Sequence, residues 1–155
     1  MPRLTLPIMA AMALCLASGA AQAGEIRIEG RGGVSWQGNG STKGTAGAAI
    51  GYDTAVSALG NGVFAGIEES VDRSAGGSGT RWATSARLGI KVLSLGALYG
   101  ITGYHYGSGP NATSIGAGYQ QGLGPVYGKV EYRHYINEGA WRPGDTVTLG
   151  FGVKF

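Results

Sequence analysis

The sequence predicts an all-β protein: an eight-stranded antiparallel transmembrane up-and-down β-barrel, preceded by a cleaved signal peptide. Three observations support this prediction. After residue 23 the chain divides into eight segments of alternating apolar and polar residues, with turn residues between them. The charged residues of these segments gather on one face, and the opposite face is apolar. No apolar run after residue 23 is long enough for a membrane-spanning helix.

Residues 1–23 have the pattern of a signal peptide. Arg3 supplies a positive start, an apolar run follows, and Ala21-Gln22-Ala23 fits a small-residue cleavage site. We therefore expect two regions, a signal peptide over residues 1–23 and a barrel over residues 24–155. The one cysteine, Cys15, falls in the removed segment, so the mature chain would have no disulfide framework.

Composition argues against several classes of protein. The formal net charge of +3 is too small to indicate nucleic acid as a partner. The 31 glycines lack the period of collagen, and regularly spaced aromatic and apolar residues argue against disorder. Two histidines and a single cysteine argue against a metal site, and no phosphate-binding loop is present. We expect no cofactor.

The expected strands are about ten residues long, as in the smallest transmembrane barrels. They cover residues 25–36, 44–55, 62–70, 81–92, 95–106, 113–121, 126–137 and 146–155. The connections after the first, third, fifth and seventh strands are expected to be the longer or more polar ones, with 71–80 as a loop and 56–61 as a tight turn. Transmembrane barrels have long outer loops and short periplasmic turns, so this pattern places both termini in the periplasm.

Alternation alone also fits a soluble barrel of the lipocalin type, with its apolar face inside. The distribution of charge favours the membrane, because a cation on a lipid-facing surface costs about 2–4 kcal/mol at the midplane. Buried charges must be paired, so we expect an ion-pair network that plugs the narrow interior. Its expected members share the inward face: Glu25, Arg27, Glu29, Arg31, Asp53, Glu68, Arg81, Arg87, Lys91, Lys129, Glu131 and Arg133.

Aromatic residues near strand ends support the same choice. Trp36 and Trp82 are expected at one rim of the barrel, and Tyr52 and Phe155 at the opposite rim. Rings of aromatic residues at both membrane interfaces are typical of transmembrane barrels.

The C-terminal segment carries a resemblance to a known family. Thr148, Gly150, Val153 and Phe155 fit the insertion signal of outer-membrane proteins, and residues 118–133 resemble small outer-membrane barrels of the opacity-protein and OmpA-like type. The resemblance implies a monomeric, non-enzymatic barrel of the bacterial outer membrane, surrounded by lipid and lipopolysaccharide. Periplasmic chaperones and the assembly machinery would deliver it, and it would support envelope integrity or surface interaction.

Two alternative functions remain open. The stretch from His134 to Asp145 is similar to the active-site region of lipid A 3-O-deacylases, in which a histidine acts beside a serine. The serine would fall at Ile136, so the sequence offers no catalytic nucleophile, and His134 is the single candidate for a lipid A-modifying hydrolase. A narrow channel is the other alternative.

Overall fold

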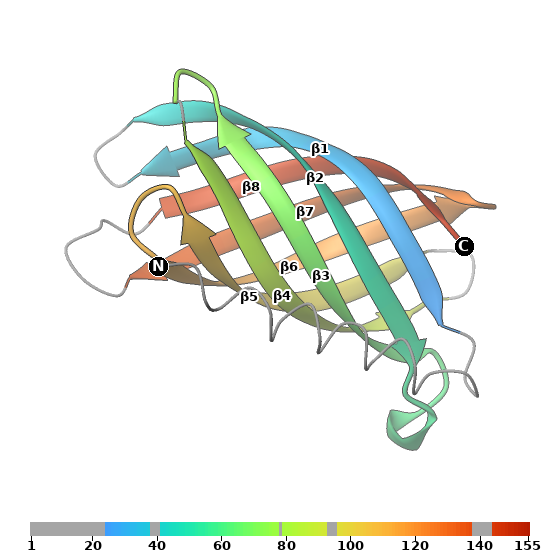
Figure 1. Cartoon of the computed structure of the whole chain (residues 1–155). Coiled ribbons are helices and arrows are strands. Elements are labelled where there is room, and N and C mark those ends of the chain that lie inside the picture. The colour runs from blue at the N-terminus through green and yellow to red at the C-terminus, as the bar shows by residue number, and fades with distance from the viewer. Residues whose placement is uncertain (1–23, 38–40, 78, 93–95, 138–143) are drawn as a thin grey trace.

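A computed structural model shows a closed antiparallel barrel of eight strands, and this confirms the predicted fold class (Figure 1). The structure describes residues 24–37, 41–77, 79–92, 96–137 and 144–155. The strands are β1 (Glu25–Gln37), β2 (Thr42–Ala55), β3 (Val63–Ser74), β4 (Thr80–Lys91), β5 (Ala97–Gly107), β6 (Ala112–Leu123), β7 (Val126–Asn137) and β8 (Gly144–Lys154). Each strand pairs with its neighbours in sequence, in an up-and-down order.

Closure occurs between β1 and β8. Their pairing runs from Arg27 opposite Lys154 to Gln37 opposite Gly144. Beyond the ladder, the Ile26 amide donates to the Phe155 carbonyl at 3.0 Å, and the Phe155 amide donates back at 2.9 Å. Every strand is therefore paired on both sides, which removes the unpaired edges that lipid could not satisfy.

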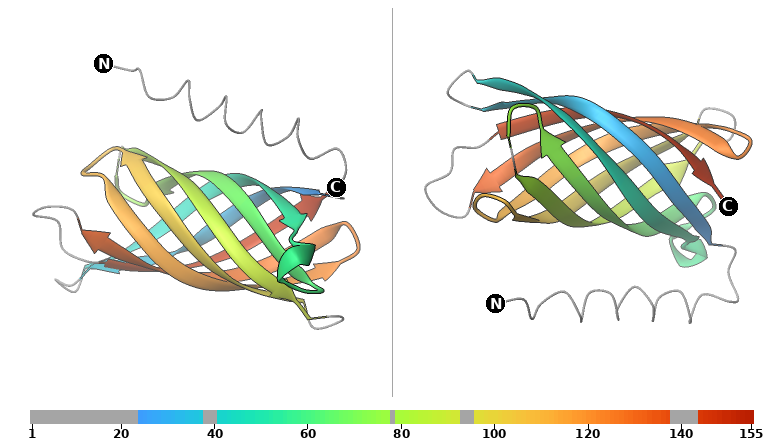
Figure 2. Two further views of the ribbon diagram at one scale, coloured as in Figure 1. Left: turned by 90° about the horizontal axis from the view of Figure 1, so that it is seen from below. Right: turned by 45° about the horizontal axis from the view of Figure 1, so that its top comes forward.

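The start of β1 and the end of β8 lie at the same end of the barrel, which we call the near end (Figure 1). The connections β1–β2, β3–β4, β5–β6 and β7–β8 lie at the opposite, far end. The tilted strands cross the barrel wall between the two ends (Figure 2). No helix among the described residues is long and apolar enough to span a membrane.

The two faces of each strand differ in the way that a membrane requires. Large apolar side chains point outward from the strands, as with Ile28 at 49%, Leu149 at 56% and Phe151 at 73% exposure. Charged side chains such as Arg27 and Glu131 are each 1% exposed and point inward. The period of two along each strand places these sets on opposite faces.

Strand β3 is longer than the sequence pattern predicts. It continues to Ser74, so the first four residues of the expected loop at 71–80 belong to β3, and the connection covers residues 75–79. Asp72 points inward, where Arg31 donates a hydrogen bond to it at 2.8 Å. Arg73 closes the hairpin by donating to the Thr80 hydroxyl at 3.1 Å. The contact with the distant Arg31 and the contact within the hairpin keep residues 71–74 in the strand, although their composition is typical of a loop.

The predicted difference in loop length fails at the connection between β2 and β3. The connection over residues 56–62 is not a tight turn, because it contains a 3-10 helix, η1 (Ser57–Leu59), at the near end. It is longer than the connection of residues 75–79 at the far end. The expected turn at Leu93-Ser94 and most of the expected loop at 138–145 lie outside the described residues. Loop length therefore gives no argument about which end faces the periplasm.

Candidate functional site

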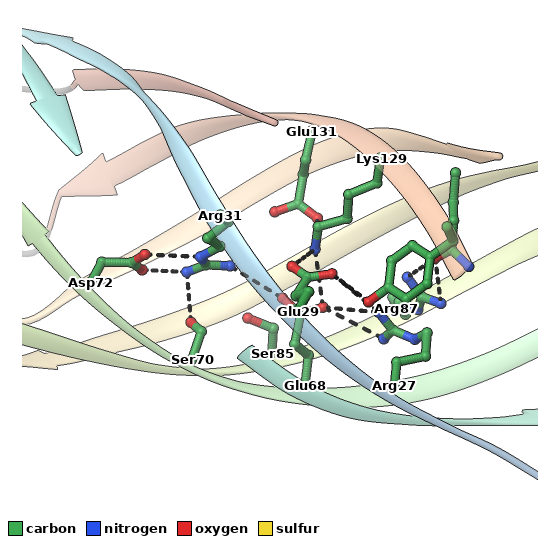
Figure 3. Close-up of polar contacts among 12 residues, drawn as sticks. Arg27, Glu29, Arg31, Glu68, Ser70, Asp72, Ser85, Arg87, Lys129 and Glu131 are labelled. Carbon is green, nitrogen blue, oxygen red and sulfur yellow. Dashed lines mark hydrogen bonds and ion pairs between the residues drawn. The ribbon is translucent and has the colours of Figure 1, made fainter. Parts of the chain in front are cut away.

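The candidate site is the polar interior of the barrel, where ionised side chains from five strands meet (Figure 3). Each of these side chains is at most 8% exposed, and together they form the ionic core of the molecule. The members of the ionic core are Arg27, Glu29, Arg31, Asp53, Glu68, Arg87, Lys129, Glu131 and Arg133.

Glu68 on β3 is the centre of the ionic core. Lys129 donates to its Oε2 at 3.2 Å, and the Nη1 atom of Arg27 lies 3.4 Å from the same oxygen. Its other oxygen, Oε1, accepts from Arg31 and Arg133, each at 3.3 Å. One carboxylate that is 2% exposed therefore joins cations from β1 and β7.

Towards the near end, Asp53 on β2 joins two arginines. Arg27 donates from Nε to Asp53 Oδ2 at 2.9 Å, and Arg87 donates from Nε to Oδ1 at 2.8 Å. The guanidinium of Arg87 also lies over the rings of Tyr99 and Phe64, 4.7 and 5.1 Å from their centres. This stacking combines ion pairing with cation–π contact and fills the near half of the barrel.

Two tyrosines connect the ionic core to the barrel wall. Tyr127 donates to Glu29 at 2.7 Å, and Tyr99 donates to Glu131 at 2.9 Å. Lys129 lies 2.6 Å from Glu29 and 3.4 Å from Glu131, so both carboxylates have a cation and a phenol as neighbours. Charge-assisted bonds of this kind are stronger than neutral ones.

Inward glycines provide the space for these long side chains. A Cβ at Gly66 would overlap the carboxylate of Asp53, and a Cβ at Gly118 would overlap the ring of Tyr99. By contrast, a Cβ at the outward-facing Gly30 would meet nothing within 4 Å. Much of the glycine content of the inward face thus reflects close approach of neighbouring side chains.

The formal charges of the interior cancel. The ion pairs join the cations Arg27, Arg31, Arg87, Lys129 and Arg133 to the carboxylates Glu29, Asp53, Glu68, Asp72 and Glu131. Removal of one partner from a buried pair leaves an uncompensated charge and costs about 3–5 kcal/mol. The ionic core is therefore a stabilising unit only while it is complete.

Three charges expected in the interior, Glu25, Lys91 and Arg81, lie at its ends. The Lys91 side chain is 52% exposed at the near end, with Nζ 3.9 Å from Glu25, which also accepts from Lys154 at 3.1 Å. Arg81 is half-buried at the far end and donates to the Pro110 carbonyl at 3.2 Å. This placement corrects the expectation that the three belong to the buried network, because their strand positions reach the openings of the barrel.

A cavity of about 360 Å³ lies at the far end. Its lining includes Arg31 and Arg133 from the ionic core, together with Lys43, Arg81 and Tyr135. The interior is therefore packed near the termini and open beyond the ionic core.

The expected rim aromatics lie at opposite ends of the outward face. Trp36 pairs across the strands with Asp145, and the 44% exposed Trp82 pairs with Tyr106 at the far end. At the near end, Ile26 lies between Tyr52 on one side and the 75% exposed Phe155 on the other.

Glu69 departs from the expected distribution of charge. It lies mid-way along the extended β3, on the outward face, rather than at a strand end. The hydroxyls of Tyr106 and Thr84 each donate to its carboxylate at 2.7 Å. The strict one-face rule is thus wrong for this residue, and local hydroxyl donors compensate for its position. The sequence pattern missed it because Ser70 was expected to end the strand.

His134 lies on the outward face of β7 and has an acidic partner. Its Nδ1 is 2.9 Å from Asp145 Oδ1, and the Tyr132 hydroxyl donates to the same oxygen at 2.5 Å. Ile136 occupies the position two residues along the same face. The structure thus contains a histidine–carboxylate pair, while the position expected for a serine nucleophile is aliphatic.

The residues of the expected insertion signal divide between the two faces of β8. Thr148 and Gly150 are buried in the interior, whereas Val153 and Phe155 are 37% and 75% exposed on the outward face. Within the described part of the chain, no group of His, Cys, Asp or Glu is arranged to hold a metal ion.

Comparison with solved structures identifies the fold. The N-terminal barrel domain of Pseudomonas aeruginosa OprF matches with a TM-score of 0.60 and 16% identity, over 84% of this chain and 97% of that one. The chain has the fold of the small eight-stranded outer-membrane barrels. No protein-family profile and no curated protein sequence match it.

Two further barrels show the same likeness. Neisserial surface protein A matches with a TM-score of 0.57 and 10% identity, over 85% of this chain and 97% of that one. The Yersinia pestis outer-membrane protein Ail matches with a TM-score of 0.52 and 17% identity, over 86% of this chain and all of that one. At these identities the likeness concerns the fold alone.

Proposed function

We propose that the protein is a non-enzymatic integral barrel of the bacterial outer membrane, plugged by its ionic core, that supports envelope integrity or surface interaction. One observation carries this proposal: the molecule is inverted relative to a water-soluble barrel. Arg27 and Glu68 are at most 2% exposed, while Leu149 and Phe151 are more than half exposed. In water this arrangement would expose an extensive apolar surface, whereas lipid would cover it.

The proposal extends to topology and partners. Both termini of the barrel would face the periplasm, and the apolar belt would contact outer-membrane lipid and lipopolysaccharide. A closed barrel has no free edge with which to pair, which favours a monomer. Periplasmic chaperones and the assembly machinery would deliver the chain through the signal at Thr148, Gly150, Val153 and Phe155.

Heat-modifiable migration tests the barrel proposal. A folded barrel resists detergent and migrates differently on a denaturing gel before and after boiling. We expect the protein in outer-membrane fractions to show this shift. Identical migration of boiled and unboiled samples, or recovery outside that fraction, would contradict the proposal.

A matched pair of variants tests the insertion signal. Phe155→Ala removes the terminal aromatic of the signal, and Phe151→Ala removes an aromatic of similar exposure from the same outward face. We expect Phe155→Ala to lower the amount of folded protein in the outer membrane more strongly. Equal levels of the two variants would show that Phe155 acts as one more lipid-facing side chain.

A second candidate function, a lipid A-modifying hydrolase, is favoured by the His134–Asp145 pair on the outward face. An imidazole oriented by a carboxylate is a suitable general base. Mass spectrometry of lipid A from deletion and overexpression strains tests this candidate. It requires a change in acylation that His134→Ala abolishes, and unchanged lipid A in both strains contradicts it.

A further inference from the structure

We propose that the far end of the barrel binds a phosphate monoester of a sugar. The site is the cavity of about 360 Å³ above the ionic core, which we call the cup. This assignment goes beyond the proposed function, which names no ligand. It also holds whichever end of the barrel faces the periplasm.

The floor of the cup is a pair of arginines held in fixed positions. Arg31 donates to Asp72 at 2.8 Å and to the Ser70 hydroxyl at 2.7 Å. Arg133 donates to Glu131 at 2.6 Å and from Nη1 to the Ser85 hydroxyl at 2.9 Å. Both arginines are at most 8% exposed, so they are ordered before a ligand arrives.

The charge of the cup is positive. Among the described lining residues the carboxylates are Asp72 and Glu131, and each is paired with an arginine of the floor. Lys43 on β2 and Arg81 on β4, which lies across the strand pair from Asp72, also line the cup, so its described lining has four cations and two carboxylates. A cavity with one sign of charge concentrates ligands of the opposite sign.

The remaining lining suits the hydroxyls of a sugar. Side-chain hydroxyls converge on the cup from β1, β2, β7 and β8; these are Ser35, Thr45, Tyr135 and Thr146. The rings of Tyr135 and His105 lie 4.7 Å apart on one wall, and His105 is held by the Ser114 hydroxyl at 2.8 Å. The volume is in the range of small-molecule sites, at about 300–1,000 Å³, and exceeds what a bare phosphate needs.

The near end provides an internal control. Its cations, Lys91 and Lys154, share the carboxylate of Glu25, and Phe64 and Tyr99 fill the adjacent interior. Among its described residues, the near end therefore has two solvent-accessible lysines but no cavity like the cup. Removal of these lysines changes the net charge of the protein without changing the proposed site.

Isothermal titration calorimetry of the refolded barrel in zwitterionic detergent, at physiological ionic strength, tests the proposal. The ligands are glucose 1-phosphate, inorganic phosphate and glucose. We expect saturable binding of glucose 1-phosphate, weaker binding of inorganic phosphate, and no binding of glucose. The absence of saturable binding by glucose 1-phosphate would overturn the proposal.

The matched variants locate the site. The double variant K43Q/R81Q should weaken the binding of glucose 1-phosphate by about tenfold or more, because it removes two charge-assisted contacts. The double variant K91Q/K154Q, with the same change in net charge, should bind as the unmodified protein does. Equal weakening in both would overturn the proposal in favour of a diffuse charge effect. Heat-modifiable migration of each variant separates loss of binding from loss of the barrel.

A competition experiment identifies the source of the phosphate monoester. The barrel is placed in lipid nanodiscs with and without lipopolysaccharide, and glucose 1-phosphate is titrated into each. Weaker apparent affinity in the presence of lipopolysaccharide would support a lipid headgroup as the ligand. Unchanged affinity would support a soluble sugar phosphate that enters the same cup.

Discussion

The near half of the barrel interior is filled by rings and ion pairs, whereas the far half is lined by small hydroxyl side chains around a cavity. Phe64, Tyr99 and Tyr127 are each at most 4% exposed in the near half. In the far half, inward positions hold smaller side chains such as Ser35 and Thr146, and these leave the cup open. Both halves have the same alternation of inward and outward residues. Side-chain size on the inward face, and not the alternation, distinguishes the filled half from the open half.

The largest expected effect falls on the centre of the ionic core. Glu68→Gln removes the charge but keeps the size, and it leaves Arg27, Arg31, Lys129 and Arg133 without their shared carboxylate. We expect a loss of about 3–5 kcal/mol in the free energy of unfolding. Urea unfolding of the barrel in detergent micelles measures it. A loss below about 1 kcal/mol would show that the pairs around Glu68 are weak.

Packing in the near half predicts the next effect. Gly118→Ala places a methyl group where the Tyr99 ring lies, and we expect a loss of about 1–3 kcal/mol from overpacking. Gly30→Ala is the control, because its methyl group points outward into open space. Equal stability of the two variants, measured by the same unfolding assay, would mean that the near half can accommodate an additional methyl group.

A phenol bound to the ionic core should contribute a comparable amount. Tyr127→Phe removes the donor to Glu29 and should cost about 1.5–3 kcal/mol, the range for hydrogen bonds to charged groups. Tyr104→Phe is the outward control, since its hydroxyl contacts Asn111 at an exposed position. The control should remain within about 0.5 kcal/mol of the unmodified barrel. A larger loss of stability for Tyr104→Phe than for Tyr127→Phe would contradict the expectation that inward hydroxyls contribute more than outward ones.

The smallest change in stability is expected at the boundary between the two halves. Asp72 is 25% exposed, and Arg31 keeps Glu68 as a partner when Asp72 is changed. Asp72→Asn should therefore cost about 1 kcal/mol or less. The same change makes the cup more positive, so the affinity for glucose 1-phosphate should rise. A fall in affinity would mean that the main effect of Asp72 is to position Arg31 for the ligand, rather than to neutralise the charge of Arg31.

The sequence predicts the strands and much of the inward set because alternation is local information. Arg27, Glu68 and Glu131 can be assigned to one face from the pattern alone, and each is buried in the structure. The extension of β3 could not be predicted in this way. The segment that contains Asp72 has the composition of a loop. Its place in the strand depends on a hydrogen bond from Arg31, which is 41 residues away in the sequence.

The orientation of β5 was equally beyond the local pattern, since both of its faces are apolar or aromatic. Tyr99 and His105 point inward, where they bond to Glu131 and Ser114 on neighbouring elements. Those partners come from β7 and β6, so they meet Tyr99 and His105 only when the three strands pair. The acidic partner of His134 was hidden in a similar way, because Asp145 lies on the next strand.

Single-channel recording of the refolded barrel in planar lipid bilayers tests the central claim most directly, namely that a paired ionic core plugs a lipid-facing barrel. The claim predicts that the unmodified protein inserts without stepwise current, because Glu68 and its cations occupy the interior between the near end and the cup. Insertion must be verified in the same preparation by heat-modifiable migration. Reproducible unitary openings of inserted protein would contradict the claim and establish the interior as a narrow channel.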